Sequence, residues 1–139
     1  TIAKLKSEGW VESKNVFGPC LVAPKELRDE WIKGLAKAII NWRITSNQAR
    51  TFSLMDTLAI SISDNANLIA GSIRAKLSEE DSEKAEPIID ESLKNGGVET
   101  YITLQAGGYI RTKSETYDAL DRAEVKLIEL LSAFDYENQ

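Results

Sequence analysis

The most regular apolar spacing in the chain runs through residues 51–77. Steps of three and four place side chains on one face of an α-helix, and apolar residues recur at these steps at Leu54, Leu58, Ile62, Ala66, Ile69, Ile73 and Leu77. The apolar arc spans about 160°, which suits a helix packed against two or more neighbours. We therefore expect a central helix over 48–77.

Pro24 precedes a second stretch with helical spacing, and proline is common at the first position of a helix. The pattern predicts a helix over 24–44 that buries one apolar face with two tryptophans, comprising Leu27, Trp31, Leu35, Ile39 and Trp42. The opposite face would carry a basic stripe, which continues beyond the helix and comprises Arg28, Lys33, Lys37, Arg43 and Arg50.

A third helix is predicted over 79–95. Ser78 and Asp81 have the spacing of a capping box, which favours a helix start at this point. Pro87 should kink or restart the helix, and Asn95-Gly96-Gly97 should end it.

The last predicted helix covers 114–134. Thr112 and Glu115 repeat the capping-box spacing before it. Apolar residues then follow at steps of three and four, at Leu120, Ala123, Leu127, Leu130 and Phe134. We interpret the residues after Phe134 as a frayed acidic end.

Two other segments depart from helical spacing. Residues 98–112 alternate apolar and polar residues around Gly107-Gly108, which predicts a β-hairpin. Residues 1–23 show a hint of a short helix that ends at Gly9, then either a small hairpin or an extended segment. We expect an irregular N-terminal arm, with Trp10 and Phe17 either packed on the chain's own core or in contact with another copy.

These elements predict a mainly α, four-helix bundle-like single domain over 1–139. It would comprise an arm (1–23), three helices within 24–95, a small hairpin (98–112) and a last helix (114–134). The expected core is apolar and consists of Leu27, Trp31, Leu35, Ile39, Trp42, Leu54, Leu58, Ile62, Ile69, Ile73, Leu120, Leu127 and Phe134.

Composition favours a globular protein without a membrane span. Of 139 residues, 42% are apolar and 28% are charged, and no apolar run approaches the ~20 residues of a membrane helix. The single cysteine, Cys20, excludes an internal disulfide framework. This fits a reducing compartment, and we expect the protein in the cytoplasm or in a virion.

The absence of histidine excludes several classes of chemistry. A Ser-His-Asp or Cys-His arrangement cannot be built, and neither can the usual His- or Cys-rich zinc sites. Asp56 and Asp64 are better explained as exposed polar positions than as a catalytic pair. We expect no enzyme activity, no metal or other cofactor and no small-molecule substrate.

Charge is distributed unevenly along the chain. Residues 1–77 contain eleven Lys and Arg against seven Asp and Glu, whereas residues 78–139 contain six against fifteen. Opposite signs in the two halves indicate contact between copies or a partner for the basic half, although the split is also compatible with a solvated surface that has no partner.

We therefore expect a structural or assembly subunit that forms a homo-oligomer or packs in a larger complex, like a virus or phage coat or scaffold protein. Self-association would use large aromatic residues of the arm and the hairpin, at Trp10, Phe17, Tyr101 and Tyr109. The alternative is a small subunit of a nucleoprotein complex whose basic stripe contacts nucleic-acid backbone.

Overall fold

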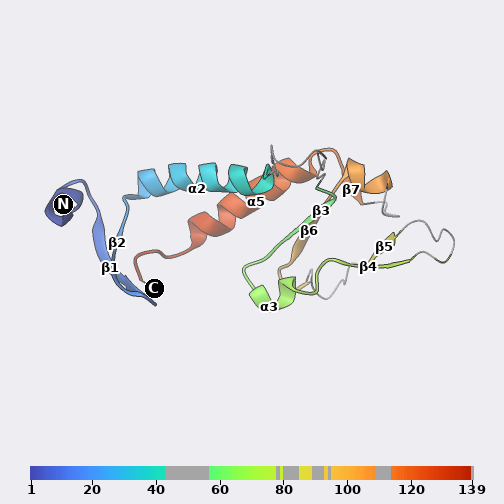
Figure 1. The fold of residues 1–139 in the computed structure, drawn as a ribbon, viewed down its shortest axis with the longest axis horizontal. Helices are drawn as coiled ribbons and strands as arrows, with labels where there is room; N and C mark the ends of the chain where they lie inside the picture. The colour runs from blue at the N-terminus through green and yellow to red at the C-terminus, as the bar shows by residue number, and fades with distance from the viewer. Residues whose placement is uncertain are drawn as a thin grey trace, which may run out of the picture. The chain divides into compact units, whose positions relative to one another are not determined.

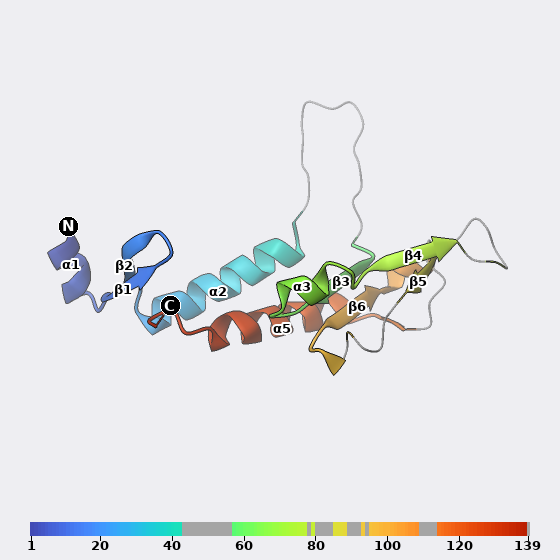
Figure 2. The same cartoon turned by 90° about the horizontal axis from the view of Figure 1, so that it is seen from below.

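The structure is a computed structural model that describes residues 1–42, 57–77, 79, 85–88, 93, 95–108 and 114–138. Contacts divide the chain into two compact units. Unit 1 comprises Thr1–Ile39 with Ile128–Gln139, and unit 2 comprises Ile40–Leu127. Helices and strands both occur among the described residues (Figures 1 and 2). The fold is therefore mixed α/β, and the expected mainly α four-helix bundle is wrong.

Unit 1 begins with a short helix, α1 (Ile2–Ser7), which stops before Gly9. The N–H of Trp10 donates to the carbonyl oxygen of Leu5 at 3.1 Å, and Gly9 has a φ of 88°. This combination is the Schellman helix end, in which glycine supplies the left-handed backbone at low cost. Gly9 therefore ends the helix, as the sequence predicts.

A β-hairpin follows α1, so the N-terminal segment has regular structure and the expected irregular arm is wrong. Strands β1 (Val11–Asn15) and β2 (Gly18–Val22) pair antiparallel from Val11↔Val22 to Asn15↔Gly18. The N–H of Phe17 donates to Oδ1 of Asn15 at 2.9 Å, so the asparagine side chain holds the turn. Sequence reasoning left this hairpin open because its two turn residues, Val16 and Phe17, are apolar rather than the usual Asn-Gly type.

Helix α2 (Lys25–Ile40) begins directly after Pro24, as predicted, and ends before the expected residue 44. Its buried face is formed by Ile32, Ala36 and Ile40, at 8%, 0% and 5% exposure. The face that was expected inside is exposed instead, comprising Trp31, Leu35 and Ile39, followed by Trp42 after the helix. The sequence carries two adjacent apolar rows, about 100° apart on the helix, so spacing alone could not decide which row is buried.

Unit 2 contains a three-stranded sheet with the order β3-β6-β7. Strand β3 (Ala59–Ile62) pairs antiparallel with β6 (Glu99–Thr103), which pairs parallel with β7 (Glu115–Thr116). Across the first pair, the hydroxyls of Ser61 and Thr100 lie 2.8 Å apart. The sheet contributes the buried residues Ile62, Tyr101, Ile102 and Thr103.

The expected central helix over 48–77 is wrong where the structure describes it, and residues 48–56 lie outside the described residues. Its span holds β3, the short helix α3 (Ala66–Ile69) and strand β4 (Arg74–Leu77). Asn65 starts α3, because its Oδ1 accepts the N–H groups of Asn67 and Leu68. Side chains four residues apart lie on one face of a helix, and also on one face of a strand because strand side chains alternate. The spacing of Leu58 and Ile62 therefore fits both structures.

Strand β5 (Ala85–Ile88) lies where the third helix was expected, so that prediction is wrong at these residues. Residues 80–84, 89–92 and 94 of the expected helix lie outside the described residues. Strand β5 pairs antiparallel with β4, from Arg74↔Ile88 to Leu77↔Ala85, and Pro87 lies within the strand. A helical turn does end at Gly96-Gly97 as predicted, where the N–H groups of Gly96 and Val98 both donate to the carbonyl of Leu93.

Of the expected hairpin over 98–112, the described residues contain the first strand, β6. Gly107-Gly108 does not form a hairpin turn but ends the 3₁₀-helix η1 (Leu104–Gly108). The antiparallel partner of β6 is β3, which lies about forty residues earlier in the chain. Residues 109–113 lie outside the described residues.

Helix α5 (Ala119–Ala133) begins later than the expected residue 114, because β7 and a turn come first. Its buried positions are Ala119 and Ala123. Of the expected core, Ile62 is buried, Leu54 lies outside the described residues, and Trp31, Leu35, Ile39 and Trp42 are exposed as described above. The other seven residues are exposed or half-buried. Phe134 and Ile73 are exposed, and the half-buried residues are Leu27, Leu58, Ile69, Leu120 and Leu127.

Candidate interaction site at the N-terminal hairpin

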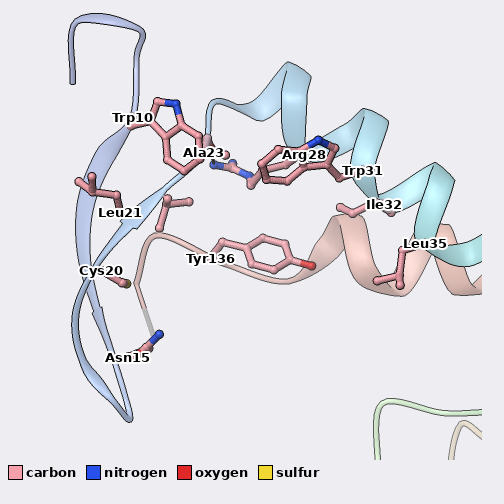
Figure 3. Close-up of a pocket in the computed structure, with 11 residues that line it drawn as sticks. Trp10, Asn15, Cys20, Leu21, Ala23, Arg28, Trp31, Ile32, Leu35 and Tyr136 are labelled. Atoms are coloured by element: carbon pink, nitrogen blue, oxygen red, sulfur yellow. Dashed lines mark hydrogen bonds between the residues drawn. The ribbon is translucent and has the colours of Figure 1, made fainter. Parts of the chain in front are cut away.

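A cavity of about 410 Å³ lies in unit 1 beside the hairpin β1–β2, the first half of α2 and the segment after α5 (Figure 3). Its lining is mainly apolar and includes three aromatic rings. It consists of Trp10, Asn15, Cys20, Leu21, Val22, Ala23, Arg28, Trp31, Ile32, Leu35 and Tyr136. This size and composition are typical of a site that accepts an apolar group and orients it with a few polar atoms.

Trp10 and Trp31 form the aromatic side of this cavity. Their ring centroids lie 6.2 Å apart with the planes at 62°, an edge-to-face arrangement. The helix end at Gly9 positions Trp10, while α2 carries Trp31. Trp31 remains 54% exposed and Leu35 remains 52% exposed, so this side of the cavity is accessible to solvent.

Among the described residues that line the cavity, Arg28 is the only cation, and its side chain is engaged within unit 1. Its Nη1 donates to the carbonyl oxygen of Ala23 at 2.6 Å, and both terminal nitrogens lie 3.3 Å from Oε1 of Glu137. The guanidinium also lies 5.7 Å from the centroid of the Tyr136 ring. Arg28 therefore joins the start of α2 to the segment that follows α5.

The segment after α5 is held by local contacts, which corrects the interpretation of a frayed acidic end. Tyr136 packs edge to face on Phe134 and donates its hydroxyl to the carbonyl of Leu131 at 2.8 Å. The hydroxyl of Ser13 on β1 donates to the carbonyl of Glu137 at 2.8 Å. These contacts place Tyr136 in the lining of the cavity (Figure 3).

Asp135 turns this segment by accepting several hydrogen bonds. The side-chain amide of Asn138 and the backbone N–H groups of Glu137 and Asn138 all donate to its carboxylate. The Asn138 amide and then the two backbone groups hold the pKa of Asp135 below its usual value. Asp135 is therefore an exposed anion beside the cavity at neutral pH.

A second polar cluster joins α5 to β6 within unit 2. The hydroxyl of Tyr101 donates to Oε2 of Glu99 at 2.5 Å, and Lys126 lies 3.3 Å from Oε1 of the same carboxylate. Arg122 lies 5.5 Å from the centroid of the Tyr101 ring. The hydrogen bond from Tyr101 lowers the pKa of Glu99 most, and burial opposes it. The hydrogen bond and charge of Lys126 and the charge of Arg122 lower this pKa further. The lowered pKa values keep Glu99 and Asp135 ionised near neutral pH, whereas a general acid must hold a proton at that pH.

The structure brings together two of the five residues of the predicted basic stripe. Lys33 and Lys37 lie one turn apart on α2 and are exposed. Arg28 points to the other side of the helix, about 140° or more around the axis from them. Arg43 and Arg50 lie outside the described residues.

The four residues predicted for self-association have different environments. Phe17 is 95% exposed at the tip of the hairpin, next to Val16 at 93%. Trp10 is half-buried in the cavity lining, and Tyr101 is 7% exposed in unit 2. Tyr109 lies outside the described residues.

Sequence reasoning missed the contributions of Leu21, Val22 and Tyr136 to the cavity. The sequence did contain a signal for Tyr136. Two aromatic residues close together, Phe134 and Tyr136, are unusual in an unstructured acidic end and favour a packed segment. Cys20 is half-buried and lines the cavity.

No group of three Cys, Asp or Glu side chains within the described ranges is placed to hold a metal ion. In the same ranges, no helix has both the length and the apolar character needed to cross a membrane. Comparisons with known protein families, characterised proteins and solved structures find no match to this chain.

Proposed function

We propose that this chain is a non-enzymatic subunit that associates with further copies of itself, alone or within a larger assembly. The observation that carries this proposal is the apolar row of α2, which we define as Trp31, Leu35 and Ile39. Each of these side chains is more than half exposed, at 54%, 52% and 53%.

The apolar row differs from ordinary surface hydrophobics by its continuity. Single exposed apolar residues are common and need no explanation. Three large apolar side chains at successive four-residue steps form one stripe along a helix, and helices present such stripes to partner proteins. Burial of the row against a partner would remove apolar surface from water, at about 25 cal/mol per Å².

Charge favours a second copy as that partner. The first 77 residues are net basic and the remaining 62 are net acidic, so one copy offers both signs to the next. Opposite charges increase the rate of encounter and fix orientation, while the apolar row would supply affinity. Added salt should then lower the association rate strongly and change the dissociation constant less.

Sedimentation velocity over a range of protein concentrations tests this proposal. The wild-type chain should form oligomers as concentration rises, and Leu35→Glu should remain monomeric because it places a charge in the apolar row. Val125→Glu is the matched control: Val125 is 66% exposed on α5 and lies in unit 2. A wild-type chain that stays monomeric at high concentration and low salt would overturn the proposal.

Binding to nucleic-acid backbone is the second candidate, favoured by the adjacent exposed lysines Lys33 and Lys37. Its support is reduced because Arg28 is engaged by Glu137 and Ala23. Filter binding to single-stranded RNA and DNA tests it. Neutralising Lys33, Lys37 and Arg43 should weaken binding and flatten its dependence on salt, if phosphate contacts carry the affinity.

A further inference from the structure

The tip of the β1–β2 hairpin presents two large apolar side chains to solvent. Val16 and Phe17 are 93% and 95% exposed. Two-residue hairpin turns usually contain Asn, Asp or Gly, because these residues adopt the backbone that the turn needs. Val and Phe bring no such advantage, so turn chemistry does not explain their presence here.

The backbone of this tip is fixed by local bonds. The side chain of Asn15 accepts the N–H of Phe17, and Asn15 is paired with Gly18 across the hairpin. A fixed tip loses little conformational freedom on binding, which favours its use as a contact. Phe17 is therefore presented as a preformed apolar knob.

The cavity defined above offers an apolar hollow of about 410 Å³ in the same unit. Trp10, Leu21 and Leu35 are among the residues that line it, and Phe17 is not. Phe17 is 95% exposed and does not enter the hollow of its own chain, so a second copy could place its Phe17 ring there.

Charges around the knob and the hollow are complementary. The tip segment 13–20 contains one charged residue, Lys14, which is exposed. The segment beside the hollow contains the exposed anion Asp135, while the charge of Glu137 is balanced by Arg28. A tip that enters the hollow would thus bring a cation toward an anion.

From this juxtaposition we propose that the Val16-Phe17 tip of one copy inserts into the Trp10–Trp31 cavity of a second copy. This inference rests on the proposed self-association and specifies its contact. The knob and the hollow are different surfaces, so one insertion leaves a free knob and a free hollow. Repeated insertion produces a ring or a chain of subunits, unless two copies exchange tips reciprocally.

Photo-cross-linking tests the contact directly. The chain is prepared with p-azidophenylalanine in place of Phe17 and mixed with an excess of ¹⁵N-labelled wild-type chain, so that adducts between copies are identified by mass. We expect adducts on cavity residues of the labelled chain, chiefly Trp10, Leu21, Trp31, Leu35 and Tyr136. The same probe in place of Tyr117, which is 88% exposed in unit 2, is the matched control and should not label these residues.

A second measurement uses the strength of association. Phe17→Ser should raise the dissociation constant about thirtyfold, as expected for loss of a buried aromatic anchor, whereas Tyr117→Ser should leave it within about twofold. Circular dichroism should be unchanged in both variants because both rings are exposed.

The outcomes separate this inference from the proposed function. If the wild-type chain forms oligomers but the probe at position 17 labels other surfaces or none, the insertion is wrong and self-association remains. If the chain is monomeric throughout, both proposals fail. If Phe17→Ser associates as strongly as wild type, the tip is not the anchor and the insertion is again overturned.

Discussion

The guanidinium of Arg28 lies 3.3 Å from the carboxylate of Glu137, although the two residues are 109 positions apart in the sequence. Arg28 also donates to the carbonyl of Ala23 and faces the ring of Tyr136. One side chain at the start of α2 therefore contacts both the preceding loop and the end of the chain.

Replacement of Arg28 should loosen this region. Arg28→Ala removes a charged hydrogen bond and a contact with an aromatic ring, and we expect a loss of about 2 kcal/mol in the free energy of unfolding. Lys25→Ala is the matched control on the same helix. Its ion pair with Asp29 is exposed, so its loss should be below about 0.5 kcal/mol. Urea unfolding checks both values, and equal effects would contradict the role of Arg28.

The Trp10–Trp31 contact should be measurable as a coupling energy. Edge-to-face pairs contribute about 0.5–1.5 kcal/mol beyond their buried area. A double-mutant cycle with Trp10→Leu and Trp31→Leu, measured at a concentration where the chain is monomeric, should give a coupling in this range. A cycle that pairs Trp10→Leu with Ile39→Ala, two helical turns beyond Trp31 on α2, should give a coupling near zero.

The hydrogen bonds to Glu99 predict a loss of stability in acid. The hydrogen bond from Tyr101 holds the folded-state pKa of Glu99 below its usual value, so the ionised carboxylate stabilises the fold at neutral pH. This contribution is lost as the pH falls through the lower folded-state pKa. The melting temperature of wild type should exceed that of Glu99→Gln at pH 7, and the difference should shrink toward pH 3.

Tyr101→Phe provides a separate check on this pH dependence. Because the hydrogen bond from Tyr101 is the largest cause of the lowered pKa, its hydroxyl should contribute more to the effect than any other single interaction. Tyr101→Phe should flatten the acid limb of the thermal stability profile without removing the Glu99 carboxylate. An acid limb identical to that of wild type would show that Lys126 dominates instead.

Ala123 should not tolerate a larger side chain. It is fully buried on α5, and added methylenes in a packed interior cost about 1–3 kcal/mol. Ala123→Leu should therefore lower the free energy of unfolding by this amount, measured by urea denaturation. Ala133→Leu lies on the exposed end of the same helix and should change stability by less than about 0.5 kcal/mol.

The sequence predicted the helices that begin with strong local signals. Pro24 marked the start of α2, and glycines marked two helix ends, at Gly9 and at Gly96-Gly97. The apolar spacing of α5 was recognised, but its start was placed too early. These features depend on the backbone chemistry of a few neighbouring residues, which a single sequence displays directly.

Sequence reasoning failed where the same spacing fits two structures. Leu58 and Ile62 share a face of a helix or of a strand, and the pairing of β3 with β6 depends on residues forty positions away. On α2, the row that contains Trp31 and the row that contains Ile32 are both apolar. Tertiary contacts, which the sequence does not display, decide which row is buried. The cavity could not be foreseen, because it needs Arg28 and Tyr136 to meet across more than a hundred residues.

The most completely buried side chains in the described part of the chain are alanines, at positions 36, 106, 119 and 123. Alanine removes little hydrocarbon surface from water, so unfolding of these regions should expose little new apolar area. These regions should then contribute little to the heat capacity of unfolding, which limits how strongly their stability varies with temperature.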